Sequence, residues 1–267
     1  MPFTPTHMIA VLPLARVRAI PFSALALGSM VPDFPLYFRI DNEAYFAAHS
    51  ALGVFTLDLP LGLLAFLTWQ ALIKRPAIEL LPAPARERLG AVRDPLPLSA
   101  PRVWAGGIAG ALIGAATHVF WDSFTHANRW GVNLLPVLDR ELLSVFGREV
   151  TGYKALQYGS TVVFLPLLFL LAALWLRRQP RVATPTPFSG GLRWAVWTAL
   201  LVTPAAVGVA AALLQPTTRS GFRRLMGYAY EAATWGGATL IGMVIVGGLL
   251  FSLRLRAADP AGDEAGC

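Results

Sequence analysis

The stretch that decides the fold is VWAGGIAGALIGAATHVFWDSFTH, residues Val103–His126. Its first fifteen residues carry no charge, and the whole stretch is long enough to cross a bilayer as one helix. It ends in three ionisable residues four apart, His118, Asp122 and His126. Residues four apart share one face of an α-helix, and these three continue a row of glycines with the same spacing. The stretch therefore predicts a membrane-spanning helix whose small and polar face packs inside a helix bundle.

The composition places the whole chain in a membrane. Of its 267 residues, 55% are hydrophobic and only 14% are charged, whereas soluble domains carry about 25% charged residues. The formal net charge is +7, but the basic residues flank apolar segments and are not interleaved with aromatic residues. This pattern is typical of the ends of membrane spans, so we expect a lipid bilayer and no nucleic acid as partner. The single cysteine, Cys267, excludes an internal disulfide.

The apolar segments predict an all-α, polytopic helix bundle with about five transmembrane helices and an N-terminal helical hairpin. We expect one transmembrane domain over residues 1–253, followed by a disordered tail over 254–267. Within it, residues 50–176 would hold the core spans and the candidate site, and residues 193–253 two C-terminal spans. The five predicted spans are Ser50–Ile73, Val103–Thr125, Tyr158–Leu176, Arg193–Leu214 and Glu231–Leu253.

Residues 1–48 contain two short apolar pieces instead of a full span. Each has about ten residues, or about 15 Å as a helix, which is half a membrane. Two such half-helices folded as a hairpin would bring His7 and Asp33 to the same end. Because Met1–Thr6 has no basic residues, we expect no cleaved signal peptide.

The loops predict an orientation. Loops 74–102 and 177–193, together with the residues after the last span, hold more Lys and Arg than the loops on the opposite side. Cytoplasmic loops are enriched in these residues, so loop 74–102 is expected in the cytoplasm and loop 126–157 outside. The chain would lie in the bacterial cytoplasmic (inner) membrane, with its polar cluster at the non-cytoplasmic face.

All four histidines of the chain and two aspartates are expected to meet at this face. His49 precedes the first span, and the antiparallel second span carries His118 and Asp122 at the same end. Imidazole and carboxylate together suit Zn²⁺, with Mn²⁺ or Fe as alternatives. The predicted metal ligands are His7, Asp33, His49, His118, Asp122 and His126, and the predicted catalytic residues are Asp33 and Asp122.

Each of these residues has a structural alternative. His118 and Asp122 could form a plain hydrogen-bonded pair, and His126 could lie in a wet loop. His7 could belong to a helix start, and Asp33, after a proline, could cap or turn the chain. Asp58 lies nine residues after His49. On a regular helix the two side chains would point about half a turn apart, so we expect Asp58 to face away from His49. Glu231 opens the last span and is expected at the interface.

Five motifs resemble a known family: MPFTPTH at 1–7, GSMVPDFP at 28–35, HSALGVFTLDLPLG at 49–62, GAATHVFWDSFTH at 114–126 and YKALQYGS at 153–160. They are similar to DUF4184, an uncharacterised family of bacterial membrane proteins. More distantly, the order of the histidines and aspartates resembles membrane-bound metal-dependent hydrolases of the YdjM type. By this resemblance His7, Asp33, His49, His118 and Asp122 would be metal ligands.

These observations predict a membrane-embedded, metal-dependent hydrolase that acts on a phosphoester or lipid-like substrate through metal-activated water. The alternative is a non-enzymatic membrane protein, either a scaffold or a small transporter, in which the His/Asp cluster is structural. A transporter needs an ionisable path to the other face, and the inner halves of the last three spans show none.

Overall fold

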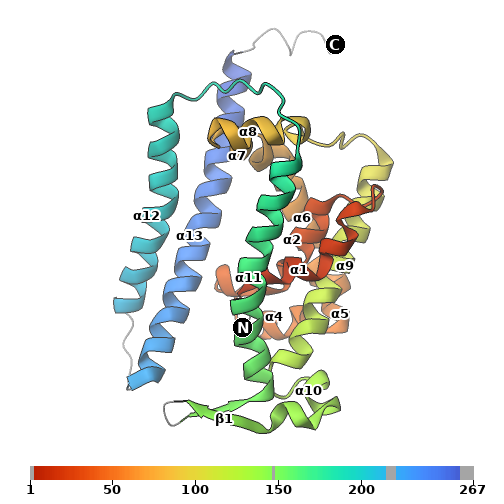
Figure 1. Cartoon of the computed structure of the whole chain (residues 1–267), viewed down its shortest axis with the longest axis vertical. Helices are drawn as coiled ribbons and strands as arrows, with labels where there is room; N and C mark the ends of the chain where they lie inside the picture. Colours follow the sequence, from red (N-terminus) through yellow and green to blue (C-terminus); the bar gives the residue numbers. More distant parts are fainter. Residues whose placement is uncertain (1–2, 146–147, 215–220, 259–267) are drawn as a thin grey trace. The chain divides into compact units, whose positions relative to one another are not determined.

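The computed structural model describes residues 3–145, 148–214 and 221–258, and most of these residues are helical (Figure 1). Each predicted span overlaps one helix that is long and apolar enough to cross a membrane, so the predicted class, an all-α membrane protein with five such helices, is confirmed. These helices are Ala51–Glu79, Pro101–Thr125, Gly152–Arg178, Gly190–Leu214 and Arg224–Arg254.

The chain forms two compact units. The first comprises Met1–Pro35, Ile40–Leu67 and Leu96–Arg178, and the second comprises Leu36–Arg39, Thr68–Pro95 and Gln179–Cys267. The single transmembrane domain over 1–253 stays a prediction. The last helix, α13, continues to Ala258. Residues 259–267 of the predicted tail lie outside the described residues.

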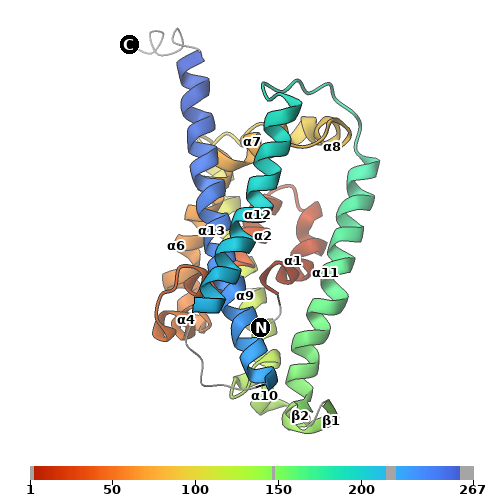
Figure 2. The ribbon, with the colours of Figure 1, turned by 90° about the vertical axis from the view of Figure 1, so that its left-hand side faces the viewer.

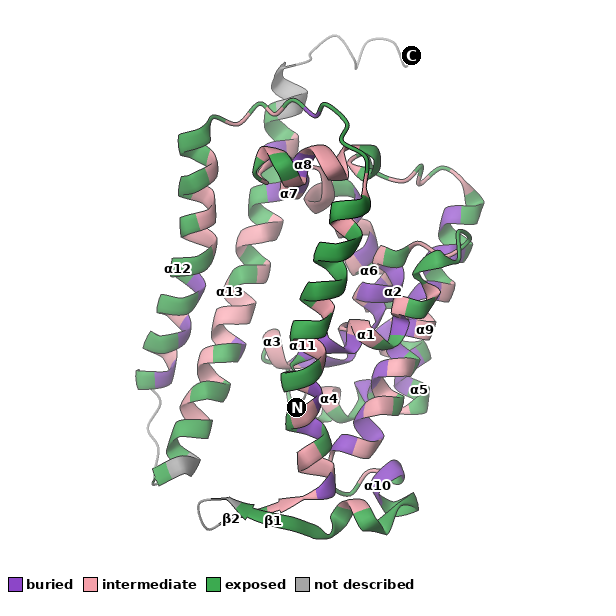
Figure 3. Ribbon diagram, viewed as in Figure 1, coloured by how far each residue is buried: buried purple, intermediate pink, exposed green. Residues whose placement is uncertain are grey.

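The central helix of the first unit is α9 (Pro101–Thr125). In its most apolar stretch 44% of the residues are buried, against 6% for α11 (Gly152–Arg178). Buried residues accordingly gather on α9 and its neighbour α2 (Phe22–Gly28), while α11 is mostly exposed (Figure 3). An exposed apolar face of this kind is what a helix presents to lipid.

The glycine row of α9 allows α2 to pack backbone to backbone. A Cβ atom on Gly110 would lie 2.8 Å from the Cβ of Ala24, and one on Gly114 would lie 2.5 Å from the backbone nitrogen of Ser29. Both contacts are too short for any side chain larger than hydrogen. The close approach carries Ser29 to His118, which lies one turn after Gly114.

The N-terminal region folds as short helical pieces that double back, as the predicted hairpin required. Val17–Pro21 separates an outgoing arm from the returning arm that begins with α2. The outgoing arm consists of η1 (Thr4–His7), α1 (Met8–Val11) and η2 (Leu12–Arg16). The returning arm continues after α2 into η3 (Val31–Asp33), α3 (Phe34–Tyr37) and α4 (Asn42–Ala48).

The helix is interrupted at His49. Asp41 caps the start of α4 by accepting a hydrogen bond from the backbone of Ala44 at 2.8 Å. His49 ends that helix, and the side chain of Ser50 caps the next one by accepting from the backbone of Gly53 at 2.9 Å. Because the end of α4 at His49 is followed directly by the N-terminal cap of α5 at Ser50, His49 lies at a bend and not within a continuous helix.

The first span contains two wide, π-helical turns. It consists of α5 (Ala51–Gly53), η4 (Val54–Asp58), α6 (Leu59–Thr68), η5 (Trp69–Ile73) and α7 (Lys74–Glu79). A proline ring clashes with the carbonyl four residues before it. For Pro60 and Pro76 these carbonyls belong to Thr56 and Leu72, which lie in η4 and η5, so the prolines account for both turns.

Between α9 and α11 the chain makes a small cap at the end of the first unit. It consists of α10 (Trp130–Leu134), η7 (Pro136–Asp139) and an antiparallel hairpin of β1 (Glu141–Val145) and β2 (Arg148–Thr151). The sequence predicts a loop over residues 126–157, and the structure shows that part of it forms short helices and a β-hairpin.

The second unit is built on two long helices, α12 (Gly190–Leu214) and α13 (Gly221–Ala258), which lie side by side (Figures 1 and 2). A Cβ atom on Gly208 would overlap the backbone of Ala232, so glycine allows their close contact. The unit also contains η5, α7 and two shorter elements, α8 (Ala83–Leu89) and η6 (Gly90–Val92). Glu231 pairs with Arg39 at 3.1 Å within this unit.

Candidate metal centre

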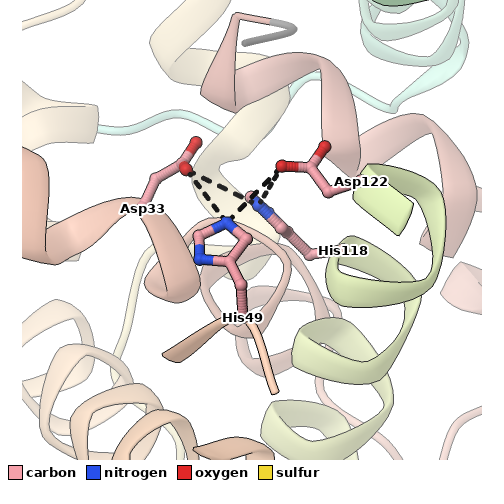
Figure 4. Close-up of side chains that lie close together, drawn as sticks. All are labelled: Asp33, His49, His118 and Asp122. Carbon is pink, nitrogen blue, oxygen red and sulfur yellow. Dashed lines mark ion pairs between the residues drawn. The ribbon is translucent and has the colours of Figure 1, made fainter. Parts of the chain in front are cut away.

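Four buried side chains of the first unit converge on one point (Figure 4). Asp33 comes from the end of η3, His49 from the bend before α5, and His118 and Asp122 from successive turns of α9. One ligand atom from each lies within 4.8 Å of the others. All four residues are at least 95% buried, with exposed fractions between 0% and 5%.

The distances between these atoms fit ligands around an ion better than hydrogen bonds. Asp33 Oδ1 lies 3.6 Å from Nε2 of both His49 and His118. Asp122 Oδ2 lies 3.4 Å from His49 Nε2 and 3.5 Å from His118 Nε2. A charged imidazole donating to a carboxylate would approach to about 2.7–2.9 Å. Two ligands of a tetrahedral zinc ion, each about 2.0–2.2 Å from it, lie about 3.3–3.6 Å apart.

The outward-facing atoms of the cluster are hydrogen-bonded to their surroundings. His118 Nδ1 lies 2.8 Å from the carbonyl of Ser29, and His49 Nδ1 lies 2.9 Å from that of Tyr45. A carbonyl only accepts, so both Nδ1 atoms carry the proton, and in the neutral rings each Nε2 presents a lone pair. Asp33 Oδ2 accepts a hydrogen bond from the hydroxyl of Thr4 at 2.7 Å. Such outer contacts are what orients metal ligands in proteins.

The inward-facing atoms, in contrast, have no hydrogen-bond partner among the described residues. They are His49 Nε2, His118 Nε2, Asp33 Oδ1 and Asp122 Oδ2, and His7 Nε2 shares this property. Buried polar atoms are nearly always paired, so the four unpaired atoms that converge on one point require an explanation. A bound cation satisfies all of them at once, because lone pairs and negative charge face a common centre. The donor set therefore fits a divalent metal ion.

His7 lies against this group. Its ring stacks on the ring of His118 with 3.7 Å between the centroids, and its Nε2 is 3.5 Å from Asp122 Oδ1. Burial, together with the neighbouring His118, lowers the pKa of His7 to about 3, so its imidazole is neutral and able to bind a metal. His7 is thus placed as a fifth candidate ligand, a role that stays a prediction.

Asp33 and His49 also lie outside the spans, and neighbouring charged groups shift the pKa of both. Burial alone would raise the pKa of Asp33, but the adjacent His118 and His49 outweigh it and hold that pKa well below its usual range. Burial alone would lower the pKa of His49, but Asp122 and Asp33 raise it. A carboxylate that stays ionised when buried is well suited to hold a cation.

His126 lies at the edge of the cluster. Its Nδ1 is 3.5 Å from Asp122 Oδ2 and 3.2 Å from the backbone carbonyl of Asp122. The amide of Gln157 lies 3.1 Å from its Nε2. With both nitrogens in polar contacts and a side chain 19% exposed, it differs from the four convergent residues, and its ligand role stays a prediction.

The direction of the Asp58 side chain stays a prediction, and the structure does not include it among the four convergent residues. Its expected direction assumed one regular helix from His49 onward, but the helix is interrupted at His49 and Asp58 ends the wide turn η4. Asp58 is fully buried, within electrostatic range of Asp33, His49 and His118, and neither carboxylate oxygen has a hydrogen-bond partner among the described residues. The sequence signal was an acidic residue inside an apolar span.

The hydrogen bonds that orient the candidate ligands have no signal in the sequence. Thr4 and the carbonyls of Ser29 and Tyr45 belong to common residue types in short helices, and no spacing rule singles them out. The structure shows that they orient Asp33, His118 and His49.

Thr4 gives a test of this orientation. The Thr4→Val variant keeps the shape of the side chain but removes the hydroxyl that donates to Asp33. We expect metal affinity to fall about 10–100-fold, the usual cost of losing such a contact, while Thr4→Ser stays near wild type. Competition with a chromophoric chelator measures both. Equal affinity in the valine variant would show that Thr4 does not orient Asp33.

The fold and the site define a class: a polytopic helical membrane protein with a buried His/Asp cluster that could hold a metal ion. The chain belongs to the DUF4184 family, whose description is a domain of unknown function and whose model matches residues 1–255. No curated protein and no solved structure matches the chain.

Proposed function

We propose that the protein binds a divalent metal ion through Asp33, His49, His118 and Asp122, and uses it to hydrolyse a phosphoester or another polar lipid bond. One observation carries the proposal: four atoms of these residues, buried and close together, face a common centre without a hydrogen-bond partner among the described residues. We place zinc first, because it favours mixed nitrogen and oxygen ligands, with manganese or iron as alternatives.

In such a site the ion supplies a nucleophile by lowering the pKa of a coordinated water to about 7. The two aspartates are the proposed catalytic residues because they provide the negative charge that holds the ion. Asp33 is also the proposed proton acceptor, and Thr4 fixes the orientation of its carboxylate. The histidines His49 and His118, turned by their bonds to backbone carbonyls, complete the binding set.

The placement of the site supports a substrate with a polar head group. His118 and Asp122 lie in the last two turns of α9, close to one end of the span. By the distribution of basic residues we assign this end to the non-cytoplasmic face of the bacterial inner membrane. A substrate could then present a polar bond at the interface while its apolar part stays in lipid.

A second candidate function is a structural metal site. Four protein ligands occupy all four coordination positions of a tetrahedral ion, and structural zinc sites have this closed arrangement. Here the four come from three segments that are distant in the sequence, so an ion would tie α9 to η3 and to the bend at His49. For hydrolysis, a metal ion held by these residues would have to keep one coordination position open to water.

Activity separates these two functions. Wild-type protein, loaded with zinc or manganese, is assayed on a chromogenic phosphodiester and on phospholipid vesicles before and after removal of the metal by a chelator. We expect hydrolysis to fall at least about 100-fold on metal removal and to return on reloading, because the ion supplies several kcal/mol of the rate enhancement. Metal-loaded protein without hydrolysis, but with a metal-dependent unfolding temperature, would support the structural site instead.

A further inference from the structure

One arginine forms a hydrogen bond with the backbone of His49, a candidate metal ligand. A terminal nitrogen of the Arg129 guanidinium donates a hydrogen bond to the backbone carbonyl of His49 at 3.0 Å. The guanidinium carbon lies 5.4 Å from the centroid of the Phe46 ring, within the range of a cation–π contact. Arg129 is therefore held on the bend that also presents the His49 imidazole to the cluster.

The backbone conformation on both sides of Arg129 places this residue beside His49. Asn128 has a φ of 60°, in the left-handed region that asparagine tolerates better than most residues. Two residues after Arg129, a Cβ atom on Gly131 would lie 2.6 Å from the hydroxyl of Ser123 and 2.8 Å from its backbone. The chain thus turns sharply after α9 and packs back against it, which fixes the position of Arg129 beside His49.

The charge of Arg129 is not balanced by an acidic side chain. Within the part of the chain that the structure describes, no carboxylate forms an ion pair with it, whereas Arg39, Arg75 and Arg93 each have at least one such partner. A guanidinium has five N–H donors, and the carbonyl of His49 accepts from only one nitrogen. Arg129 is half-buried, so its positive charge stays partly accessible beside the backbone of the candidate ligand His49.

We propose that Arg129 binds the anionic group of the substrate, and that the substrate class is therefore a phosphoester and not a neutral ester. This inference rests on the proposed function. An ion in the cluster neutralises Asp33 and Asp122, and Arg129 then adds a fixed positive charge beside it. The guanidinium matches phosphate geometry through two parallel N–H bonds, which a neutral ester carbonyl does not use.

The test uses full-length protein in detergent, loaded with metal, and inorganic phosphate as the probe. Arg129→Gln is compared with wild type and with Arg140→Gln, which removes the same charge from an exposed position of the same connection. Metal content is measured by elemental analysis and phosphate affinity by calorimetry. We expect Arg129→Gln to keep its metal and to bind phosphate at least about tenfold more weakly. Arg140→Gln should stay within about twofold of wild type, and Arg129→Lys should fall between.

The outcomes separate this inference from the function on which it rests. A wild-type protein that holds no metal overturns both. A metal-loaded Arg129→Gln variant with wild-type phosphate affinity overturns the role of Arg129 and leaves the metal site intact. Loss of metal in Arg129→Gln would show that the arginine supports His49 structurally, which also overturns anion binding.

Discussion

Replacing His118 with alanine is expected to lower metal affinity at least about 100-fold while the protein still inserts and folds. His118 contributes one of four convergent ligand atoms and lies fully buried at the centre of the cluster. The variant removes Nε2 and also the ring on which His7 stacks. Elemental analysis of the purified variant, with its unfolding temperature measured with and without added metal, checks the expectation.

His126→Ala serves as the graded comparison for this variant. Because both nitrogens of His126 have other polar contacts, we expect a smaller loss of metal than in His118→Ala. If the cluster only ties helices together, His118→Ala will unfold more easily but will not differ from wild type in bound metal. That result would favour the scaffold over the metal centre.

The second large effect is expected at Gly114, which has no role as a ligand. A Cβ atom there would overlap the carbonyl of Leu25 and lie 2.5 Å from the backbone nitrogen of Ser29. Gly114→Ala must therefore push α2 away from α9, and the carbonyl of Ser29 that orients His118 moves with it. We expect a loss of about 1–3 kcal/mol in the free energy of unfolding and about 10–100-fold weaker metal binding.

Gly159→Ala is the matched control for Gly114→Ala. Gly159 lies in α11, and a Cβ atom there would meet nothing within 4 Å. Because alanine is the better helix former, this variant should match wild type or gain up to about 1 kcal/mol. Denaturation in detergent compares the two. If the two alanine variants are equally stable, the glycine row does not set the contact between α2 and α9.

The fold could be predicted because apolar length and residue spacing act locally. The five spans follow from runs of apolar residues, and the position of His118 and Asp122 on one helix face follows from a spacing of four. The meeting of His7 and Asp33 with these residues followed from two half-helices that double back. Each of these predictions needs only the geometry of single helices, one hairpin and the antiparallel order of neighbouring spans.

The sequence does not show where the backbone departs from a regular helix. Helix α4 ends at His49, the side chain of Ser50 caps the next helix, and Asp58 lies in the π-helical turn η4. These departures depend on side-chain bonds and on Pro60, whose effects a uniform 100° rotation per residue does not include. The roles of Thr4 and Arg129 depend on contacts between distant segments, which a single sequence does not show.

The most direct test of the account is the metal content of wild-type protein, purified without chelator from cells supplied with zinc, manganese and iron. The buried cluster of Asp33, His49, His118 and Asp122 predicts about one tightly bound divalent ion per chain, retained through purification and lost in His118→Ala. A folded wild-type protein that contains no metal, and takes up none when it is offered, would contradict the account.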